Sequence, residues 1–269
     1  MKSNKKSLFR VIPAIDLMGG VVVHGVKGER ENYQPVKSIL SETAELFPIV
    51  EGFVRKLGLR EFYIADLDAI MFSMYKDHLN LITNTRAEGL NTLGTISFMV
   101  DAGVFNLAGV RKIFETGIDQ AIIGTETLPS LSILQDIINC YGADRLVVSL
   151  DTQDSKVLSA APELCNLEVP QALRLLREFG IRHYILLELR KVGTSAGLNK
   201  ELIQECLSVL NVQAPEWESS FLIGGGVSGY EDLHWLREMG VSGAIVATAC
   251  HDGRLTNENL SQLNIEDSR

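Results

Sequence analysis

One stretch of this sequence occurs twice. The first copy covers residues 101–125 and the second covers residues 224–248, and a shift without gaps places Gly103 on Gly226. Each copy reads as a loop, an amphipathic helix, a glycine that stops the helix, and a buried strand followed by a threonine. A strand–helix unit that recurs at matched spacing in the two parts of a chain predicts a barrel built from two similar halves.

Short apolar runs alternate with helical patterns along the whole chain. The expected buried strands are residues 11–15, 61–65, 96–100, 120–123, 145–150, 183–189, 220–223 and 244–246. Strict alternation over 269 residues indicates an α/β protein whose parallel strands close into a (βα)8 TIM barrel, formed by residues 1–269 as a single domain. A doubly wound open sheet is the alternative, and the repeat favours the barrel.

Composition narrows the classes of function. Apolar residues make up 46% of the chain, as in ordinary globular proteins, and the net charge of -9 disfavours nucleic acid or an anionic membrane as a partner. The basic start of the chain has no apolar segment after it, and no apolar run has transmembrane length, so we expect a cytoplasmic protein. No cluster of histidine, cysteine or carboxylate has metal-ligand spacing, so no metal site is predicted.

Two aspartates stand where a barrel enzyme places its chemistry. Asp16 and Asp151 each close an apolar strand, the first and the fifth, and these strands face each other across an eight-stranded barrel. Two carboxyl groups on opposite sides of a pocket can act as general base and general acid if their environments separate their pKa values. The alternative is that each aspartate caps the turn that follows its strand.

Glycines and threonines near the strand ends suggest two phosphate sites. Glycine lets a ligand approach the backbone, and the amides of a following helix point at the ligand. The second half offers Gly225, Gly226, Ala247 and Thr248, and the first half offers Gly103, Gly124 and Thr125. Two such sites predict an elongated substrate with a phosphate at each end. In the alternative reading the glycines only turn strands into helices, and Asp101 strengthens that reading in the first half because it would repel phosphate.

Other polar residues have weaker assignments. Asp66 and Asp68 end the second strand and are expected either to orient the ligand and support Asp16 or to be structural. Asp101, at the end of the third strand, is a further candidate for such a supporting role. His251, just beyond the second predicted phosphate site, is the best candidate for a histidine in the site. The polar loop at residues 27–35 has the composition of a mobile lid.

The motifs in their order resemble one family. They are residues 12–17 (IPAIDL), 65–68 (ADLD), 147–151 (VVSLD), 193–197 (GTSAG) and 224–227 (GGGV). Together they resemble the histidine-biosynthesis barrels, which are ProFAR isomerase (HisA) and its sister cyclase (HisF). The resemblance implies a barrel with two-fold internal symmetry, a bisphosphorylated ribotide-like substrate, and no metal or organic cofactor. It implies catalytic roles for Asp16 and Asp151 and a substrate-binding role for Thr194. The implied reaction is an Amadori rearrangement of an aminoaldose to an aminoketose, an aldose–ketose type of isomerisation.

The sequence departs from the family pattern in places that bind substrate. Residues 101–105 (DAGVF) replace a glycine-rich GGGIR segment, and Val192 replaces an aspartate. Residues 247–251 are more similar to the cyclase, and the loop at residues 20–35 is similar to that of HisA-related paralogues found beside one-carbon coenzyme genes. Three functions therefore remain open. They are a HisA-like isomerase with Asp16 as base and Asp151 as acid, a divergent paralogue acting on another phosphorylated precursor in coenzyme biosynthesis, and a non-catalytic phospholigand-binding barrel. The oligomeric state is not predicted.

Overall fold

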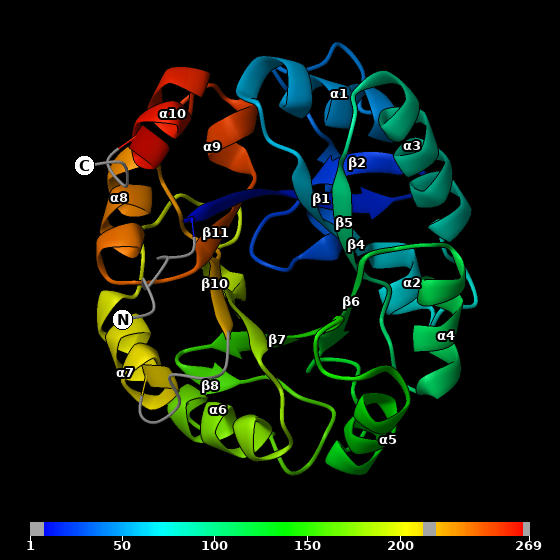
Figure 1. The fold of residues 1–269 in the computed structure, drawn as a ribbon, viewed down its shortest axis with the longest axis vertical. Coiled ribbons are helices and arrows are strands. Elements are labelled where there is room, and N and C mark those ends of the chain that lie inside the picture. Colours follow the sequence, from blue (N-terminus) through cyan, green and yellow to red (C-terminus); the bar gives the residue numbers. More distant parts are fainter. Residues whose placement is uncertain (1–7, 212–218, 266–269) are drawn as a thin grey trace, which may run out of the picture.

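The computed structural model describes residues 8–211 and 219–265, and these form a closed barrel of parallel strands surrounded by helices (Figure 1). The barrel strands are β1 (Arg10–Met18), β4 (Glu61–Asp66), β5 (Ser97–Asp101), β6 (Gln120–Gly124), β7 (Leu146–Gln153), β9 (His183–Glu188), β10 (Ser220–Gly224) and β11 (Gly243–Val246). Strand β11 pairs with β1 in parallel register and closes the ring, which confirms the barrel and excludes the open sheet. The extent of the domain, 1–269, stays a prediction.

Helices follow the barrel strands around the outside. They are α1 (Leu46–Leu57), α2 (Leu67–Met71), α3 (Leu79–Thr92), α4 (Leu107–Glu115), α5 (Leu131–Tyr141), α6 (Val169–Glu178), α7 (Lys200–Asn211), α8 (Tyr230–Glu238), α9 (Thr248–His251) and α10 (Asn257–Ile265). Short elements complete the chain: β2 (Val21–His24), β3 (Gln34–Pro35), β8 (Lys156–Val157) and the 3-10 turns η1 (Arg30–Asn32) and η2 (Leu189–Lys191). Among the described residues no helix is long and apolar enough to cross a membrane.

Alternation along the strands divides the apolar side chains into two layers. One set points into the barrel and includes Ile12, Tyr63, Met99, Ile122, Val147, Ile185, Leu222 and Ile245. The other set points outward and packs against the helices. Strands buried on both faces need apolar residues at nearly every position, and this explains why they read as continuous apolar runs in the sequence.

The repeat found in the sequence is also a structural repeat. Strands β5 and β10 start at Ser97 and Ser220, and helices α4 and α8 start at Leu107 and Tyr230, so both pairs are separated by 123 residues. Each helix ends before a glycine with positive φ, Gly117 in one half and Gly240 in the other. The half-barrel symmetry predicted from the sequence is therefore present in the backbone.

The start of the first helix differs from the expectation. The pattern at Ser41 predicted a helix from there to about Leu57, with a kink or break at Pro48. The helix begins instead at Leu46, and the Ser41 hydroxyl stabilises a turn by accepting the amide of Thr43. Pro48 thus falls in the first turn, where no intrahelical partner exists for an amide and proline causes no break.

Replacing Phe62 with Ala should reduce the free energy of unfolding by about 3–5 kcal/mol, because the aromatic ring is lost and a cavity remains. Phe62 is fully buried between the barrel and α1, with its ring 6.0 Å from that of Phe53 and 5.7 Å from that of Phe98. Urea denaturation would measure the change. Tyr75→Ala is the control: its side chain is 93% exposed, and its loss should change stability by less than about 0.5 kcal/mol. Equal effects of the two substitutions would contradict this account of the core.

Candidate active site

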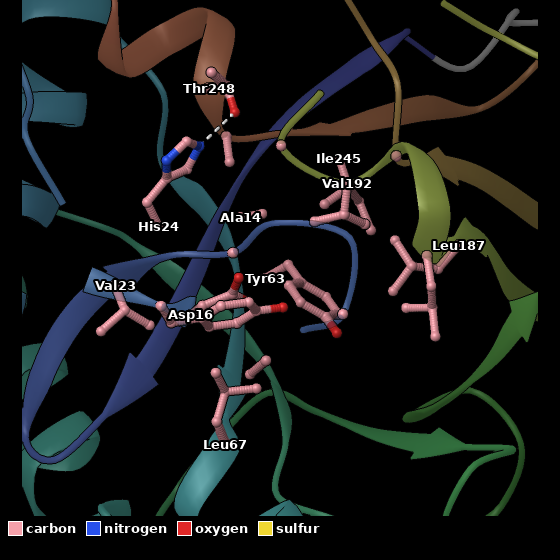
Figure 2. Close-up of a pocket in the computed structure, with 18 of the residues that line it drawn as sticks. Ala14, Asp16, Val23, His24, Tyr63, Leu67, Leu187, Val192, Ile245 and Thr248 are labelled. Carbon is pink, nitrogen blue, oxygen red and sulfur yellow. Dashed lines mark hydrogen bonds between the residues drawn. The ribbon is translucent and has the colours of Figure 1, made fainter. Parts of the chain in front are cut away.

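A cavity of about 200 Å³ opens at the carboxyl ends of the barrel strands (Figure 2). Every barrel strand or the loop directly after it contributes to its wall. The contributing residues include Asp16, Ala65, Asp101, Glu126, Asp151, Leu187, Gly225 and Ala247. Barrel enzymes carry their active sites at this end, so the cavity is the candidate site.

Asp16 lies on β1 at the wall of the cavity. The strand carries it between β4, where Ala65 is its neighbour, and β2, where Val23 is its neighbour. Its carboxylate touches the backbone of Gly25, and a side chain at Gly25 would collide with it. Burial raises the pKa of Asp16 to about 6, although the nearby Arg30 guanidinium opposes the shift. The group is therefore mostly ionised at neutral pH and can accept a proton.

Asp151 lies on β7, on the other side of the cavity. Its side chain is buried, and burial together with the negative charges of Asp101 and Glu126 raises its pKa well above the ordinary value. Asp101 ends β5 close by, and burial raises the pKa of its carboxyl to about 6, while a hydrogen bond from the amide of Gly103 opposes the shift. These influences on Asp151 favour its protonated form, which is the form that can donate a proton.

Two tyrosines line the cavity together with the carboxyl groups. Tyr63 points from β4 into the barrel interior, and its pKa is raised well above the ordinary value by burial and then by Asp101, Asp151 and Asp16. Burial, followed by Asp16, raises the pKa of Tyr33 to about 12. Both phenols therefore stay protonated at neutral pH and can donate hydrogen bonds to a ligand.

The loop at residues 27–35 crosses the mouth of the cavity. Arg30 donates to the Glu126 carboxylate at 2.8 Å, which links the loop to the chain that follows β6. The amide of Lys27 donates to the carbonyl of Val192 at 3.0 Å. Burial would lower the pKa of Arg30, but its bond to Glu126 holds the value above the ordinary one. The loop occupies the position expected of a lid, and its mobility stays a prediction.

The second-half phosphate cradle faces the cavity. Gly225, Gly226, Ala247 and Thr248 all line it, and both glycines have positive φ. The Thr248 hydroxyl shares a hydrogen bond of 3.2 Å with Nε2 of His24, as Figure 2 shows. A side chain at Gly226 would meet the carbonyl of Gly197 at 2.6 Å, so only glycine fits there. Backbone, hydroxyl and imidazole donors thus converge where the sequence predicted a phosphate.

The first-half cradle has a different environment. Gly103, Gly124 and Thr125 do not line the cavity. The Thr125 side chain is fully buried, and its hydroxyl donates to the carbonyl of Leu158 and accepts the amide of Asp151. At Gly103 a side chain would meet the backbone of Ile70, so this glycine allows close packing of α2. The geometry gives no support to phosphate binding by these three residues.

Thr194 also lies outside the cavity wall, although its neighbours Gly193 and Ser195 line it. Its hydroxyl donates to the carbonyl of Lys191 at 2.8 Å and accepts the amide of Ala196. This arrangement stabilises the turn after β9. The substrate-binding role that the family resemblance implied for Thr194 gains no support from its contacts.

Asp66 and Asp68 lie outside the cavity wall, in a buried polar cluster with His78. Asp66 caps α2 through the amide of Ala69 and lies 3.0 Å from Nδ1 of His78. Asp68 accepts from the ammonium of Lys76 and from the amide of Gly19. The three residues lie within metal-binding distance of one another, but protein donors already occupy their carboxylate oxygens. Their contacts are those of a structural brace.

His251 lines the cavity at the end of the short helix α9. Its Nδ1 lies 2.8 Å from the Ser38 hydroxyl, and burial, followed by the proximity of His24, lowers its pKa to about 4. The imidazole is therefore neutral at physiological pH. The sequence identified this histidine correctly as one near the cavity, and its use in catalysis stays a prediction.

Sequence reasoning did not identify several residues of the wall, among them His24, Arg30, Tyr33, Tyr63 and Glu126. The position of Tyr63 could have been predicted from strand alternation, because it lies two positions before Ala65 on the inward face of β4. Arg30 and Tyr33 come from a loop whose path no local pattern specifies. Glu126 follows the threonine of the first repeat, where a phosphate was expected.

Comparison with known proteins gives a consistent result. The family model described as histidine biosynthesis protein matches residues 10–256. A protein of Methanocaldococcus jannaschii named only as uncharacterized is 30% identical, over 93% of this chain and 97% of its own. A phosphoribosyl imidazole-4-carboxamide isomerase (ProFAR isomerase) of Thermus thermophilus is 28% identical over 91% of this chain and 96% of its own. The same isomerase of Methanosphaera stadtmanae is 25% identical over 93% of this chain and 97% of its own. The match spans the barrel and the end that carries the cavity, and the chain belongs to the histidine-biosynthesis (HisA/HisF) family.

Proposed function

We propose that the protein is a HisA-like isomerase that rearranges a phosphorylated aminoaldose to an aminoketose by acid–base catalysis. Similar proteins named as isomerases support an enzyme of this class. The observation that carries the proposal is the position of Asp16 and Asp151. Their carboxyl groups come from strands on opposite sides of the barrel and line one cavity.

The two carboxyl groups have the properties that the reaction needs. Over the whole rearrangement C2 loses a proton and becomes the ketone, and C1 of the enolamine gains one. Ring opening requires a proton for the ring oxygen, and formation of the enolamine requires removal of the proton at C2 of the sugar. Asp151, whose pKa is raised well above the ordinary value by burial and by Asp101, supplies the first proton. Asp16, ionised above about pH 6, accepts the second. Separated pKa values in one pocket are the signature of an acid–base pair.

The geometry of the second-half cradle supports a sugar phosphate as the substrate. The cradle at the ends of β10 and β11 provides the Gly226 backbone, the Thr248 hydroxyl and His24. An anchored phosphate would fix the distance from the cradle to the reacting carbons. Anchoring of this kind converts binding free energy into orientation of the sugar between the two carboxyl groups.

The proposal predicts a bell-shaped dependence of kcat/KM on pH. Asp16 acts as a base only when ionised, so the rate should fall about tenfold per pH unit below its pKa of about 6. On the alkaline side the rate should fall as Asp151, whose pKa is raised by burial, loses its proton. Steady-state assays across pH would measure both limbs, with circular dichroism in the same buffers as the control. An acid limb at the ordinary aspartate pKa would contradict the role of Asp16.

Exchange of the C2 proton tests the reaction itself. The protein would be incubated in deuterated water with phosphorylated aminoaldoses, and NMR would follow loss of the C2 proton and entry of deuterium at C1 of the product. We expect incorporation with the native protein and none with Asp16→Asn. Binding of these compounds without exchange would favour the non-catalytic phospholigand barrel.

A second candidate is a paralogue that performs the same chemistry on another phosphorylated precursor, such as one in one-carbon coenzyme biosynthesis. Asp101 favours it, because this residue places a carboxyl beside Asp151 where the family has glycine. Expression in a strain that lacks ProFAR isomerase would separate the two. Growth without histidine supports the histidine role, and failure of a folded, soluble protein to support growth favours the paralogue.

A further inference from the structure

We propose that the substrate carries phosphate at one end only, and that its other end presents an ammonium group to Asp101. The inference rests on the proposed function, because it assigns the two ends of the same cavity. One end is the cradle at β10 and β11, and the other end lies against β5, β6 and β7. The chemistry of the second end decides the class of substrate.

Carboxyl groups gather at the β5–β7 end. Asp101 and Asp151 approach the same point of the backbone: a Cβ added at Gly124 would lie 3.2 Å from an oxygen of Asp101 and 3.8 Å from one of Asp151. Glu126 lies on the same wall of the cavity. Glu126 is paired with Arg30, and the raised pKa of Asp151 favours its neutral form, so Asp101 is the carboxyl of this end that a ligand cation would meet.

Arg30 does not convert this end into an anion site. Arg30 is the only lysine or arginine among the described residues that line the cavity, and its guanidinium donates a hydrogen bond to Glu126 at 2.8 Å. A phosphate there would face Asp101 and would have to compete with Glu126 for the guanidinium. Like charges at close range oppose binding, and this cost is largest where water is excluded.

The donors that a phosphate would need are also in use. The amide of Gly103 donates to Asp101, and the Thr125 hydroxyl donates to the carbonyl of Leu158. The matching residues in the second half, Gly226 and Thr248, instead line the cavity. The two ends therefore have the same backbone frame and opposite binding properties.

An unpartnered hydroxyl gives an independent sign of a polar ligand at this end. Ser149 lies on β7 beside Gly124 of β6, two residues before Asp151 and on the same inward face of the strand. Its side chain is 1% exposed, and its Oγ has no hydrogen-bond partner among the described residues. A buried hydroxyl without a partner is costly. Ser149 is not part of the cavity wall, so a water held between it and a ligand amine would satisfy it.

An ammonium group fits these features better than a neutral hydroxyl. It carries three donors, enough for Asp101, a water bound to Ser149 and one further acceptor. It also supplies the positive charge that stabilises the ionised form of the buried carboxyl. A substrate with one phosphate and one amine is thus complementary to both ends of the cavity.

Binding of three matched sugars tests the inference. Calorimetry would compare three sugars that share the 6-phosphate: glucosamine 6-phosphate with an ammonium at C2, glucose 6-phosphate with a hydroxyl there, and glucose 1,6-bisphosphate with a second phosphate at C1. We expect the amine to bind about tenfold more tightly than the neutral sugar, since a hydrogen bond between charged groups is worth that factor or more. The bisphosphate should bind most weakly.

Two variants show which end of the cavity determines each difference in affinity. Asp101→Asn keeps the acceptor for Gly103 and removes the charge, so it should abolish the preference for the amine and leave glucose 6-phosphate unchanged. Thr248→Val should weaken all three ligands. Asp136→Asn, an exposed position on α5, makes the same charge change outside the site and should leave all affinities unaltered.

The possible outcomes separate the two proposals. If the bisphosphate binds as tightly as the amine and Thr248→Val weakens both, the one-phosphate inference is wrong and the proposed function stands. If none of the three sugars binds, or Thr248→Val changes nothing, the phosphate cradle is wrong, and the proposed function and this inference both fail. An amine preference that survives Asp101→Asn would also overturn the inference.

Discussion

Replacing Asp151 with Asn should lower kcat by roughly three orders of magnitude, within the range of about 10²–10⁴ that proton transfer by a positioned group contributes. The amide has nearly the same shape as the carboxyl but cannot donate an acidic proton to a ring oxygen. Asp16→Asn should have an effect of the same order, because the amide cannot accept the proton from C2. Single-turnover assays with each variant would measure the chemical step separately from product release.

The controls distinguish lost chemistry from lost structure. Asp136→Asn changes an exposed aspartate on α5, outside the cavity, and should retain full activity. Both catalytic variants should keep the native affinity for the sugar phosphate, because the Thr248 cradle is untouched. Near-native turnover in either variant would remove that aspartate from the mechanism.

The barrel could be predicted from sequence because its determinants are local and repeated. Apolar runs at the eight strands alternate with helical patterns, and the shift that superposes Gly103 on Gly226 also superposes α4 on α8. Asp16 and Asp151 could be assigned to the cavity for the same reason, since the end of a barrel strand specifies the side of the barrel. Once the eight strands are assigned to a barrel, the fold itself requires the last strand, β11, to pair with the first, β1.

The first-half cradle could not be judged from sequence, because its glycines and threonine match those of the second half. What differs is where their hydrogen bonds go. The Thr125 hydroxyl reaches the carbonyl of Leu158, a residue that follows β8 and has no counterpart in the repeat. The Thr248 hydroxyl instead meets His24, from the excursion after β1. Long-range partners of this kind leave no signal in a local motif.

The same limitation applies to the loop over the cavity. Its polarity indicated a covering segment, but the pairing of Arg30 with Glu126 joins residues that are 96 positions apart. The acidic end of the cavity results from that pairing together with Asp101. Two halves with one backbone frame thus differ in the groups that they present to the cavity, and we propose that one end binds an anion and the other a cation.

Replacing Asp101 with Asn should stabilise the fold at neutral pH by about 1–3 kcal/mol, although it removes a group proposed to bind substrate. Burial raises the pKa of Asp101 from 3.8 to about 6. The folded state therefore holds the proton more tightly than the unfolded state does. The carboxyl is most favourable to folding below about pH 4, and that contribution is lost as the pH rises through 6.

Asp101→Asn tests directly whether the Asp101 charge destabilises the fold, because asparagine keeps the acceptor for the amide of Gly103 and carries no charge. Urea denaturation should show the gain in stability above about pH 7 and should show it shrinking towards zero near pH 4. Asp136→Asn, at an exposed position, should change stability by less than about 0.5 kcal/mol at either pH. A loss of stability at neutral pH would mean that the Asp101 charge has a stabilising partner in the free protein, and the space facing it would then not be a site for a ligand cation. A gain would mean that the fold tolerates an unfavourable charge at this position, as binding sites do when a ligand later neutralises it.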